Sequence, residues 1–228
     1  MLTNLIGKGL QADVYEYEGR AIKLFHDPNK KSFAFCEAAL LALIEKTDLP
    51  SPHVYEIKRI EGHWAIIMDF IEGNHIADDM ANHMEAFVDL QIKMNSMDVP
   101  NGLFMANSND LCKNIIQSSD YLDPNTKERL LSLLASFAQE NKLCHNDYHR
   151  LNVIKNDTGL HIIDWSSATG GSPLQDACRT YLLTLEHHKE YAEHYLSTYC
   201  ARAKVACDDV LKWIPLIHAV NPGLAAFL

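Results

Sequence analysis

The sequence predicts an α+β fold with two lobes, a small antiparallel β-sheet that carries one helix and a larger, mainly helical lobe. Three observations predict it. Short β-type runs joined by tight turns dominate residues 1–72, with one helix-like run among them. From residue 73 onward, apolar residues recur at helical spacing in several long segments. Within this second part, residues 143–165 instead form two short apolar runs that contain closely spaced polar residues.

The first lobe reads as strand, strand, helix, strand, strand. Two β-type runs meet at Glu18–Gly19 and two more meet at Glu61–Gly62, which favours a hairpin at each position. Between the hairpins, residues 33–47 carry apolar side chains at helical spacing, and the two prolines of the following DLPSP segment end the helix. We therefore expect an antiparallel sheet with one helix packed on it.

The second lobe is expected to be helical except around residues 143–165. The NDTG sequence at 156–159 predicts a turn that folds the two short apolar runs into a hairpin. The other predicted segments are helices at 77–97, 125–142, 175–203 and 207–220, and a loop rich in Gly, Asn and Pro at 98–110.

The composition is that of a globular protein, with 228 residues of which 47% are hydrophobic and 22% are charged. A net charge of -10 argues against a nucleic-acid or anionic-membrane surface. The beginning of the sequence does not resemble a signal peptide and no run is long enough to span a bilayer, so we expect a soluble, cytoplasmic protein. The six cysteines contain no C-x-x-C pair and are expected to be reduced thiols. Nothing in the sequence indicates an oligomeric state.

The polar residues of HNDYHRLN and HIIDW have the spacing that phosphoryl transfer requires. Asp147 precedes Asn152 by one short loop, and Asp164 follows the predicted hairpin turn. One carboxylate can orient or deprotonate an acceptor hydroxyl, while an amide oxygen and a second carboxylate hold Mg²⁺ against nucleotide phosphates. These hard oxygen ligands suit Mg²⁺ better than zinc.

Two other readings of this segment stay open. Cys144, His145, Asp147 and His149 lie close together in sequence, as zinc ligands do, although the paired spacings and second ligand pair of such sites are missing. The polar residues also fit a structural role as caps on a buried hairpin.

The segment CHNDYHRLNVI…IIDW resembles the catalytic and metal-binding segments of the aminoglycoside phosphotransferase and choline kinase superfamily. The resemblance implies a protein-kinase-like fold that binds ATP between two lobes and phosphorylates small-molecule hydroxyl groups. It implies that Asp147 is the catalytic base and that Asn152 and Asp164 are Mg²⁺ ligands. His145 would brace the catalytic loop, and His149 matches a second histidine that is common in the family.

The family pattern also extends to the first lobe. The IGKGLQADVY turn would place Gly7 and Gly9 over the phosphates, because glycine lets backbone N–H groups approach phosphate oxygens, and Val14 over the adenine. Lys23 would bind the α- and β-phosphates and pair with Glu37 of the following helix. On their own, these two charged residues fit a solvated strand lysine and a surface glutamate equally well.

The IIMDFIEG segment resembles the hinge of the family. Met68 would close the back of the pocket, and the backbone near Asp69 and Ile71 would bind adenine. Asp176 resembles the aspartate that ties down the catalytic loop. It is expected to position that loop without contacting ATP.

The sequence departs from the family pattern at several positions. Asn146 replaces a common glycine, Arg150 and Leu151 replace a frequent Pro-Gly pair, and Ser166 replaces a frequent acidic residue. Few residues separate Asp164 from Asp176, which leaves no room for the activation segment of a protein kinase. A small-molecule acceptor is therefore favoured over a peptide.

Together these features predict an ATP- and Mg²⁺-dependent O-phosphotransferase. Residues 1–72 would form the nucleotide-binding lobe, and residues 73–228 would carry the catalytic loop and the substrate site. The acceptor would be an amino-alcohol, an aminoglycoside or a related compound. The acidic second half is compatible with a cationic acceptor, although general solubility explains the same charge. The alternative is a catalytically silent kinase-like domain that binds a nucleotide or a partner, and a protein kinase ranks third.

Overall fold

The structure is a computed structural model that describes residues 2–99 and 105–221. By its internal contacts the chain divides into two compact units. Unit 1 consists of Met1–Asn74 and Ile154–Ser166, and unit 2 consists of His75–Val153 and Ser167–Leu228. The hairpin that follows the predicted catalytic loop thus belongs to the same unit as the first sheet. Each unit is described below by itself.

Unit 1 is built on a five-stranded antiparallel sheet with the strand order β1-β2-β3-β5-β4. Its strands are β1 (Asn4–Lys8), β2 (Ala12–Tyr17), β3 (Arg20–Phe25), β4 (Val54–Ile60) and β5 (His63–Asp69). The sequence forms two tight hairpins at the predicted positions. Glu18 and Gly19 have φ angles of 52° and 74°, and Glu61 and Gly62 have φ angles of 51° and 88°. Two consecutive residues with positive φ are the requirement of the turn that suits a twisted hairpin.

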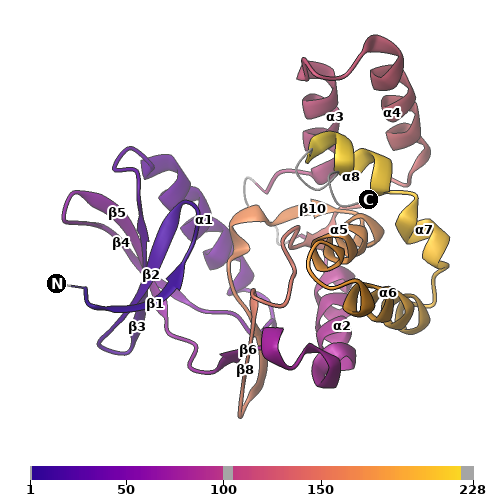
Figure 1. Cartoon of the computed structure of the whole chain (residues 1–228). Coiled ribbons are helices and arrows are strands. Elements are labelled where there is room, and N and C mark those ends of the chain that lie inside the picture. Colours follow the sequence, from indigo (N-terminus) through magenta and orange to yellow (C-terminus); the bar gives the residue numbers. More distant parts are fainter. Residues whose placement is uncertain (1, 100–104, 222–228) are drawn as a thin grey trace. The chain divides into compact units, whose positions relative to one another are not determined.

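Helix α1 (Lys31–Ile44) packs on one face of this sheet, as Figure 1 shows. Small helix residues allow the close approach of helix and strands. The buried residues of this face are Ala12, Phe25, Ala34, Ala38 and Ile66. The second part of unit 1 is the hairpin of β8 (Val153–Asn156) and β9 (Gly159–Ile162), and β6 (Asn74–His75) is the third strand of its sheet.

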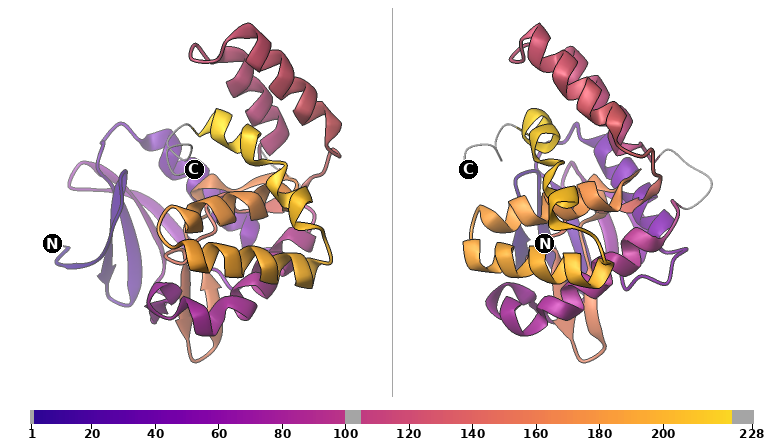
Figure 2. Two further views of the ribbon diagram at one scale, coloured as in Figure 1. Left: turned by 45° about the vertical axis from the view of Figure 1, so that its right-hand side comes forward. Right: turned by 90° about the vertical axis from the view of Figure 1, so that its right-hand side faces the viewer.

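Unit 2 is mainly helical. In Figure 1, α5 and α6 lie side by side, with α2 beside α6. Both views in Figure 2 show α3 and α4 as an antiparallel pair that projects from the rest of unit 2. The helices are α2 (Met80–Ser96), α3 (Ser108–Ser118), α4 (Pro124–Ser136), α5 (Pro173–Leu185), α6 (Lys189–Ala203), α7 (Cys207–Leu211) and α8 (Ile214–Val220), and 3-10 turns lie at Ile76–Asp78 and Trp165–Ser167.

The strands β7 (Lys142–Cys144) and β10 (Thr169–Gly171) pair antiparallel in unit 2. They frame the segment that contains the predicted catalytic residues. Phe87 of α2 stacks on Tyr148 of this segment with ring centroids 4.3 Å apart. The Tyr148 hydroxyl donates a hydrogen bond to the Phe87 carbonyl oxygen, so the segment is anchored in the core of unit 2.

The predicted fold class is confirmed, including the single helix on a small antiparallel sheet and the larger helical part. Several details differ from the sequence prediction. The helix expected at 125–142 ends at Ser136, and Lys142 lies in strand β7 instead. Helix α3 was not predicted and begins inside the loop expected at 98–110, of which residues 100–104 lie outside the described residues. Strand β10 was not predicted. The helices expected at 175–203 and 207–220 are each divided in two. The second division falls just before Pro215, which lies in the first turn of α8, where proline is tolerated.

No helix in residues 2–99 or 105–221 combines the length and the apolar character needed to cross a membrane.

Candidate active site

The glycine-rich turn between β1 and β2 is tight at Gly9. The Gly9 N–H donates to the Ala12 carbonyl oxygen at 2.9 Å. A Cβ atom at Gly9 would lie 2.9 Å from this oxygen, closer than real Cβ atoms come to a backbone oxygen. A Cβ atom at Gly7 would lie 3.5 Å from Cβ of Val14, which is an ordinary contact. Of the two predicted glycines, Gly9 is therefore the one that the backbone requires.

Lys23 lies in an ion-paired group within unit 1. It is the cross-strand partner of Val14 on β2, so both side chains lie on the same face of the sheet. Its Nζ atom is 2.6 Å from Oε1 of Glu37 on α1 and 3.1 Å from Oδ1 of Asp164 after β9. The structure thus brings three of the sequence-predicted residues together, including two that are separated by 141 positions.

The charges of this group depend on their mutual contacts. Burial acts to lower the pKa of Lys23, but the carboxylates of Glu37 and Asp164 outweigh it and hold the pKa above its ordinary value. Burial raises the pKa of Glu37, against the influence of Lys23. Lys23 is therefore a fixed positive charge at neutral pH, and Asp164 is one of its two anionic partners.

Asp164 itself has an unusual backbone conformation, with a φ angle of 58°. A non-glycine residue in the left-handed region is uncommon and often marks a functional site. Ser166 donates a hydrogen bond of 2.7 Å from its Oγ to Oδ1 of Asp164. The serine that departs from the family pattern thus helps to orient this carboxylate.

The predicted hinge follows β5, and Asp69 fixes its first residue. The Asp69 carboxylate accepts hydrogen bonds from Nη1 of Arg20 at 2.7 Å and from the Tyr55 hydroxyl at 2.6 Å. It also accepts from the backbone N–H of His53 at 3.0 Å. Burial acts to raise the pKa of Asp69, but the hydrogen bonds from Tyr55 and His53 outweigh it and lower the pKa below the usual value of an aspartate. Met68 pairs across the sheet with Ala21 of β3, and Ile71 follows two residues beyond the end of β5.

The predicted catalytic loop lies in unit 2, where Asp147 and Asn152 face each other. Nδ2 of Asn152 donates to Oδ2 of Asp147 at 3.0 Å and to the Asp147 carbonyl oxygen at 2.9 Å. Nε2 of His149 lies 3.6 Å from the same carboxylate. The fully buried His145 accepts the Asp147 N–H on its Nδ1 at 3.2 Å, which is the kind of contact expected from a brace.

The environment of Asp147 keeps its carboxyl group ionised. Burial acts to raise its pKa, but the hydrogen bond and charge of His149, followed by the charges of His145 and Arg179, lower it below the usual value of an aspartate. A carboxylate that is ionised at neutral pH can accept a proton from a hydroxyl group held within hydrogen-bond distance.

Asp176 on α5 connects this loop to the interior of unit 2. Its Oδ1 accepts the backbone N–H of Asn146 at 2.7 Å. Its Oδ2 accepts Nδ2 of Asn95 at 3.0 Å and Nε2 of Gln91 at 3.3 Å, and Gln91 in turn accepts the Tyr195 hydroxyl at 2.6 Å. Asp176 was identified from the sequence, but its buried partners Asn95 and Gln91 on α2 were missed, because a single glutamine or asparagine on an amphipathic helix carries no local signal.

The predicted metal ligands are divided between the units, Asn152 in unit 2 and Asp164 in unit 1. Among the residues that the structure describes, no three His, Cys, Asp or Glu side chains are grouped closely enough to hold a metal ion. The zinc reading of Cys144, His145, Asp147 and His149 therefore gains no support from the structure.

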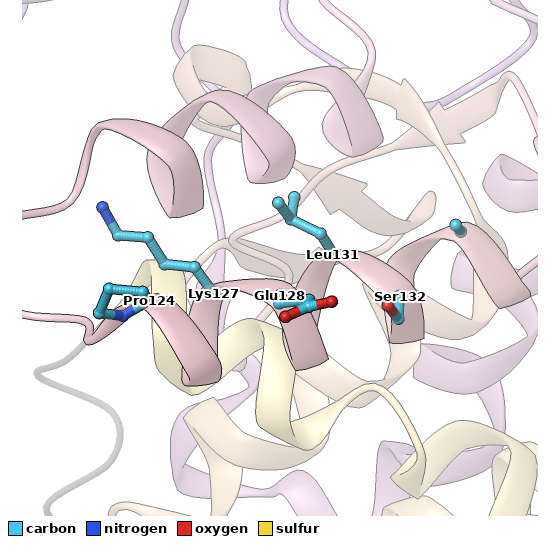
Figure 3. Close-up of a pocket in the computed structure, with 6 residues that line it drawn as sticks. Pro124, Lys127, Glu128, Leu131 and Ser132 are labelled. Carbon is cyan, nitrogen blue, oxygen red and sulfur yellow. The ribbon is translucent and has the colours of Figure 1, made fainter.

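A surface hollow lies along α4, and none of the residues that line it is a predicted site residue. Figure 3 shows that Lys127 and Leu131 rise from the same side of this helix. Nζ of Lys127 donates to the Gln117 carbonyl oxygen at the end of α3, which ties the two helices together. The hollow is lined by Pro124, Lys127, Glu128, Leu131, Ser132 and Ala135.

Comparison with known proteins identifies the family and the fold of this chain. Residues 4–211 match the family described as "Phosphotransferase enzyme family". Aminoglycoside phosphotransferase APH(3'')-Id from Streptomyces rimosus, in complex with ADP and streptomycin, is 15% identical with a TM-score of 0.67, over 91% of this chain and 90% of that chain.

A thermostable mutant of aminoglycoside phosphotransferase APH(4)-Ia, in a ternary complex with AMP-PNP and hygromycin B, is 14% identical with a TM-score of 0.69. The alignment covers 100% of this chain and 88% of that chain. No curated protein sequence matches. At these identities the structural likeness establishes the fold, which is protein-kinase-like.

Proposed function

Because the chain belongs to the phosphotransferase enzyme family, we propose that it transfers the γ-phosphate of ATP, with Mg²⁺, to a hydroxyl group of a small molecule. Phosphoryl transfer to a hydroxyl group is the activity that the family and the fold carry. We propose in addition that ATP is the phosphate donor, that Mg²⁺ is required, and that the acceptor class and the residue roles are those given below.

The observation that supports this function best is the ion pair between Lys23 and Asp164. These residues lie 141 positions apart, and their Nζ and Oδ1 atoms are 3.1 Å apart. A phosphate-binding lysine and a metal-binding aspartate must lie side by side if both act on one triphosphate. Glu37 holds the lysine on its other side at 2.6 Å, so the ammonium group is fixed before a nucleotide binds.

In unit 2, Asp147 is the proposed base. The acceptor hydroxyl gives its proton to the Asp147 carboxylate while the acceptor oxygen bonds to the γ-phosphorus. The bond from that phosphorus to the β–γ bridging oxygen breaks, and ADP leaves with its electron pair. Little covalent chemistry is required of the protein, so positioning and charge neutralisation supply most of the rate.

The donor set fits Mg²⁺. Nδ2 of Asn152 is held by Asp147, which turns Oδ1 of the amide away from that carboxylate, and no hydrogen bond to this oxygen is found in the described part of the chain. The Asp164 carboxylate would supply a second hard oxygen ligand. When bound, Mg²⁺ would neutralise charge on the nucleotide phosphates.

The nucleotide is assigned to the first lobe, residues 1–72, with the phosphates under Gly7 and Gly9 and the adenine against Val14 and Met68. The Asp69 N–H already donates to the His53 carbonyl oxygen at 2.9 Å. Asp69 would therefore offer adenine its carbonyl oxygen, and Ile71 its N–H.

The acceptor is assigned to the second lobe, residues 73–228, in the vicinity of Asp147. The related structures contain streptomycin or hygromycin B, both aminoglycosides. An amino-alcohol, an aminoglycoside or a related hydroxyl compound is the class of acceptor that we propose.

A panel of such compounds, incubated with the protein and MgATP, tests the function directly. We expect ADP release that depends on one group of acceptors, and mass spectrometry should find one phosphate added to a hydroxyl of that acceptor. Nucleotide binding without a phosphorylated product across the panel would instead favour the catalytically silent domain.

A further inference from the structure

Arg179 on α5 is a cation that forms no ion pair with the described side chains of unit 2. It lies one helical turn after Asp176, on the same side of the helix as the aspartate that holds the catalytic loop. The side chain is half-buried, and its Nε atom is buried with no acceptor. Among the side chains that the structure describes, none forms a hydrogen bond or an ion pair with the Arg179 guanidinium.

The two carboxylates whose charges act on Arg179 are engaged elsewhere. These are Asp147 and Asp176. Asp176 accepts three hydrogen bonds, from Asn146, Asn95 and Gln91. Asp147 is held by Asn152 at 3.0 Å, with His149 at 3.6 Å. Neither carboxylate lies within 4.0 Å of the Arg179 guanidinium, since neither forms an ion pair with it among the described residues.

A guanidinium group that is partly removed from water is costly unless an anion compensates its charge. Its planar array of N–H donors matches the geometry of a carboxylate or a phosphate. Arg179 acts electrostatically on Asp147, because its charge is one of those that lower the pKa of that residue. Arg179 also lies one helical turn after Asp176, whose carboxylate accepts the N–H of Asn146, the residue before Asp147, so the arginine and the proposed base lie in the same part of unit 2.

We propose that Arg179 binds an anionic oxygen group, a carboxylate or a phosphate, that the acceptor carries beside its reactive hydroxyl. This inference rests on the proposed function and narrows its substrate class. A polycationic acceptor without an acidic group would place ammonium groups near a guanidinium that has no ion pair among the described side chains. A zwitterionic hydroxyl compound satisfies Arg179 with its anionic group and, through its cationic group, remains compatible with the acidic balance of the chain.

A binding test needs no turnover. Thermal unfolding of the full chain is followed in glycerate and, as the uncharged counterpart, in glycerol, with the ionic strength balanced by NaCl and no nucleotide present. Glycerate should raise the melting temperature of the wild type and of Arg129→Gln, whose arginine is exposed on α4. It should not raise that of Arg179→Gln. An equal rise in Arg179→Gln, or no rise in the wild type, would overturn the proposal.

A kinetic test uses the acceptor that the panel identifies, together with its ester or amide, in which the anionic group is neutralised. For the wild type, neutralising this group should lower kcat/KM roughly 10- to 100-fold, the scale of a lost charge-assisted hydrogen bond. In Arg179→Gln the same neutralisation should change kcat/KM little, because the contact is already absent. The assignment would be refuted if the identified acceptor carries no anionic group. It would also be refuted if Arg179→Gln lowers kcat/KM by the same factor for the anionic acceptor and for its neutralised form.

The two tests separate this inference from the proposed function. If no compound in the panel is phosphorylated, phosphotransfer fails while the melting experiment still reports on Arg179. If phosphorylation occurs but glycerate stabilises Arg179→Gln as it does the wild type, only the role of Arg179 fails.

Discussion

The backbone N–H of Asn146 donates a hydrogen bond of 2.7 Å to Oδ1 of Asp176, 30 positions further along the chain. Asn146 immediately precedes the proposed base and has a φ angle of 60°. This left-handed conformation costs a non-glycine residue energy, although asparagine tolerates it best. The Asn146 side chain adds a hydrogen bond of 2.8 Å to Oγ1 of Thr169. The proposed catalytic loop is thus held from both sides at the residue before Asp147.

Tyr195→Phe should destabilise the protein, because Tyr195 is linked through Gln91 to Asp176. The hydroxyl of Tyr195 donates to Oε1 of Gln91 at 2.6 Å, and both residues are fully buried. Its removal leaves a buried acceptor without a donor, which costs about 1–3 kcal/mol. Urea unfolding at neutral pH measures this loss.

Tyr181→Phe is the matched control, because the Tyr181 hydroxyl makes a longer contact of 3.3 Å with Glu193, an exposed residue. We expect its loss of stability to be well below that of Tyr195→Phe. If both variants lose the same stability, the buried network does not have the importance assigned to it.

Lys23→Met should weaken nucleotide binding. The substitution removes the ammonium group that lies between Glu37 and Asp164, and with it the proposed contact to the phosphates. We expect the Kd for MgATP to rise roughly tenfold or more, as for the loss of a charge-assisted contact. Lys58→Met is the control, since Lys58 is an exposed β4 lysine that pairs only with exposed Glu56 among the described residues. Isothermal calorimetry should show near-wild-type affinity for the control, and the same affinity in Lys23→Met would contradict the assignment.

The lowered pKa of Asp147 predicts the form of the pH profile. Because its pKa in the folded protein lies below the unfolded value of about 3.9, the stabilisation from this group is present above that value. It is lost only as the pH falls through the folded pKa. We therefore expect kcat/KM to show no loss from protonation of Asp147 between about pH 8 and pH 5.

His149→Gln tests the cause of that shift, because His149 is the strongest of the groups that lower the pKa of Asp147. The acidic limb of kcat/KM should move to higher pH in this variant. His194→Gln, at an exposed position on α6, should leave the limb unchanged. An acidic limb that stays in place in His149→Gln would show that Asp147 is not the titrating base.

The two glycines of the first turn should respond differently to alanine. A Cβ atom at position 9 meets the Ala12 carbonyl oxygen at 2.9 Å, so Gly9→Ala must move the backbone of the turn. Gly7→Ala meets only Val14 at 3.5 Å. We expect Gly9→Ala to raise the KM for ATP several-fold, on the order of 1 kcal/mol of lost binding, and Gly7→Ala to change it little. Equal effects would mean that the turn is not fixed by Gly9.

The sheet of unit 1 was predictable because its turns are local. Glu18–Gly19 and Glu61–Gly62 define the hairpins, and the strands between them alternate in the ordinary way. Helix α3 was missed because it directly follows a loop rich in Gly, Asn and Pro. Its one clear signal is Asn107, whose side chain accepts the Asn109 N–H at 2.9 Å as a helix cap.

The candidate site was predictable where the sequence pattern is contiguous, as at Asp147 and Asn152. The departures from the family pattern have physical explanations only in the structure. Asn146 replaces glycine at a position with positive φ that asparagine tolerates, and Ser166 donates to the Asp164 carboxylate. Gln91 was not predictable, because its role depends on contacts with Asp176 and Tyr195 on two other helices. Arg179 was not predictable either, because only the structure shows that its buried Nε atom has no partner among the described residues.

The most direct measurement is the turnover of Asp147→Ala with the acceptor that the panel identifies. Without the proposed base, kcat should fall roughly 10²–10⁴-fold, the usual scale for general base catalysis, while the protein still binds MgATP. Turnover close to that of the wild type, with the variant folded and nucleotide bound, would contradict the account.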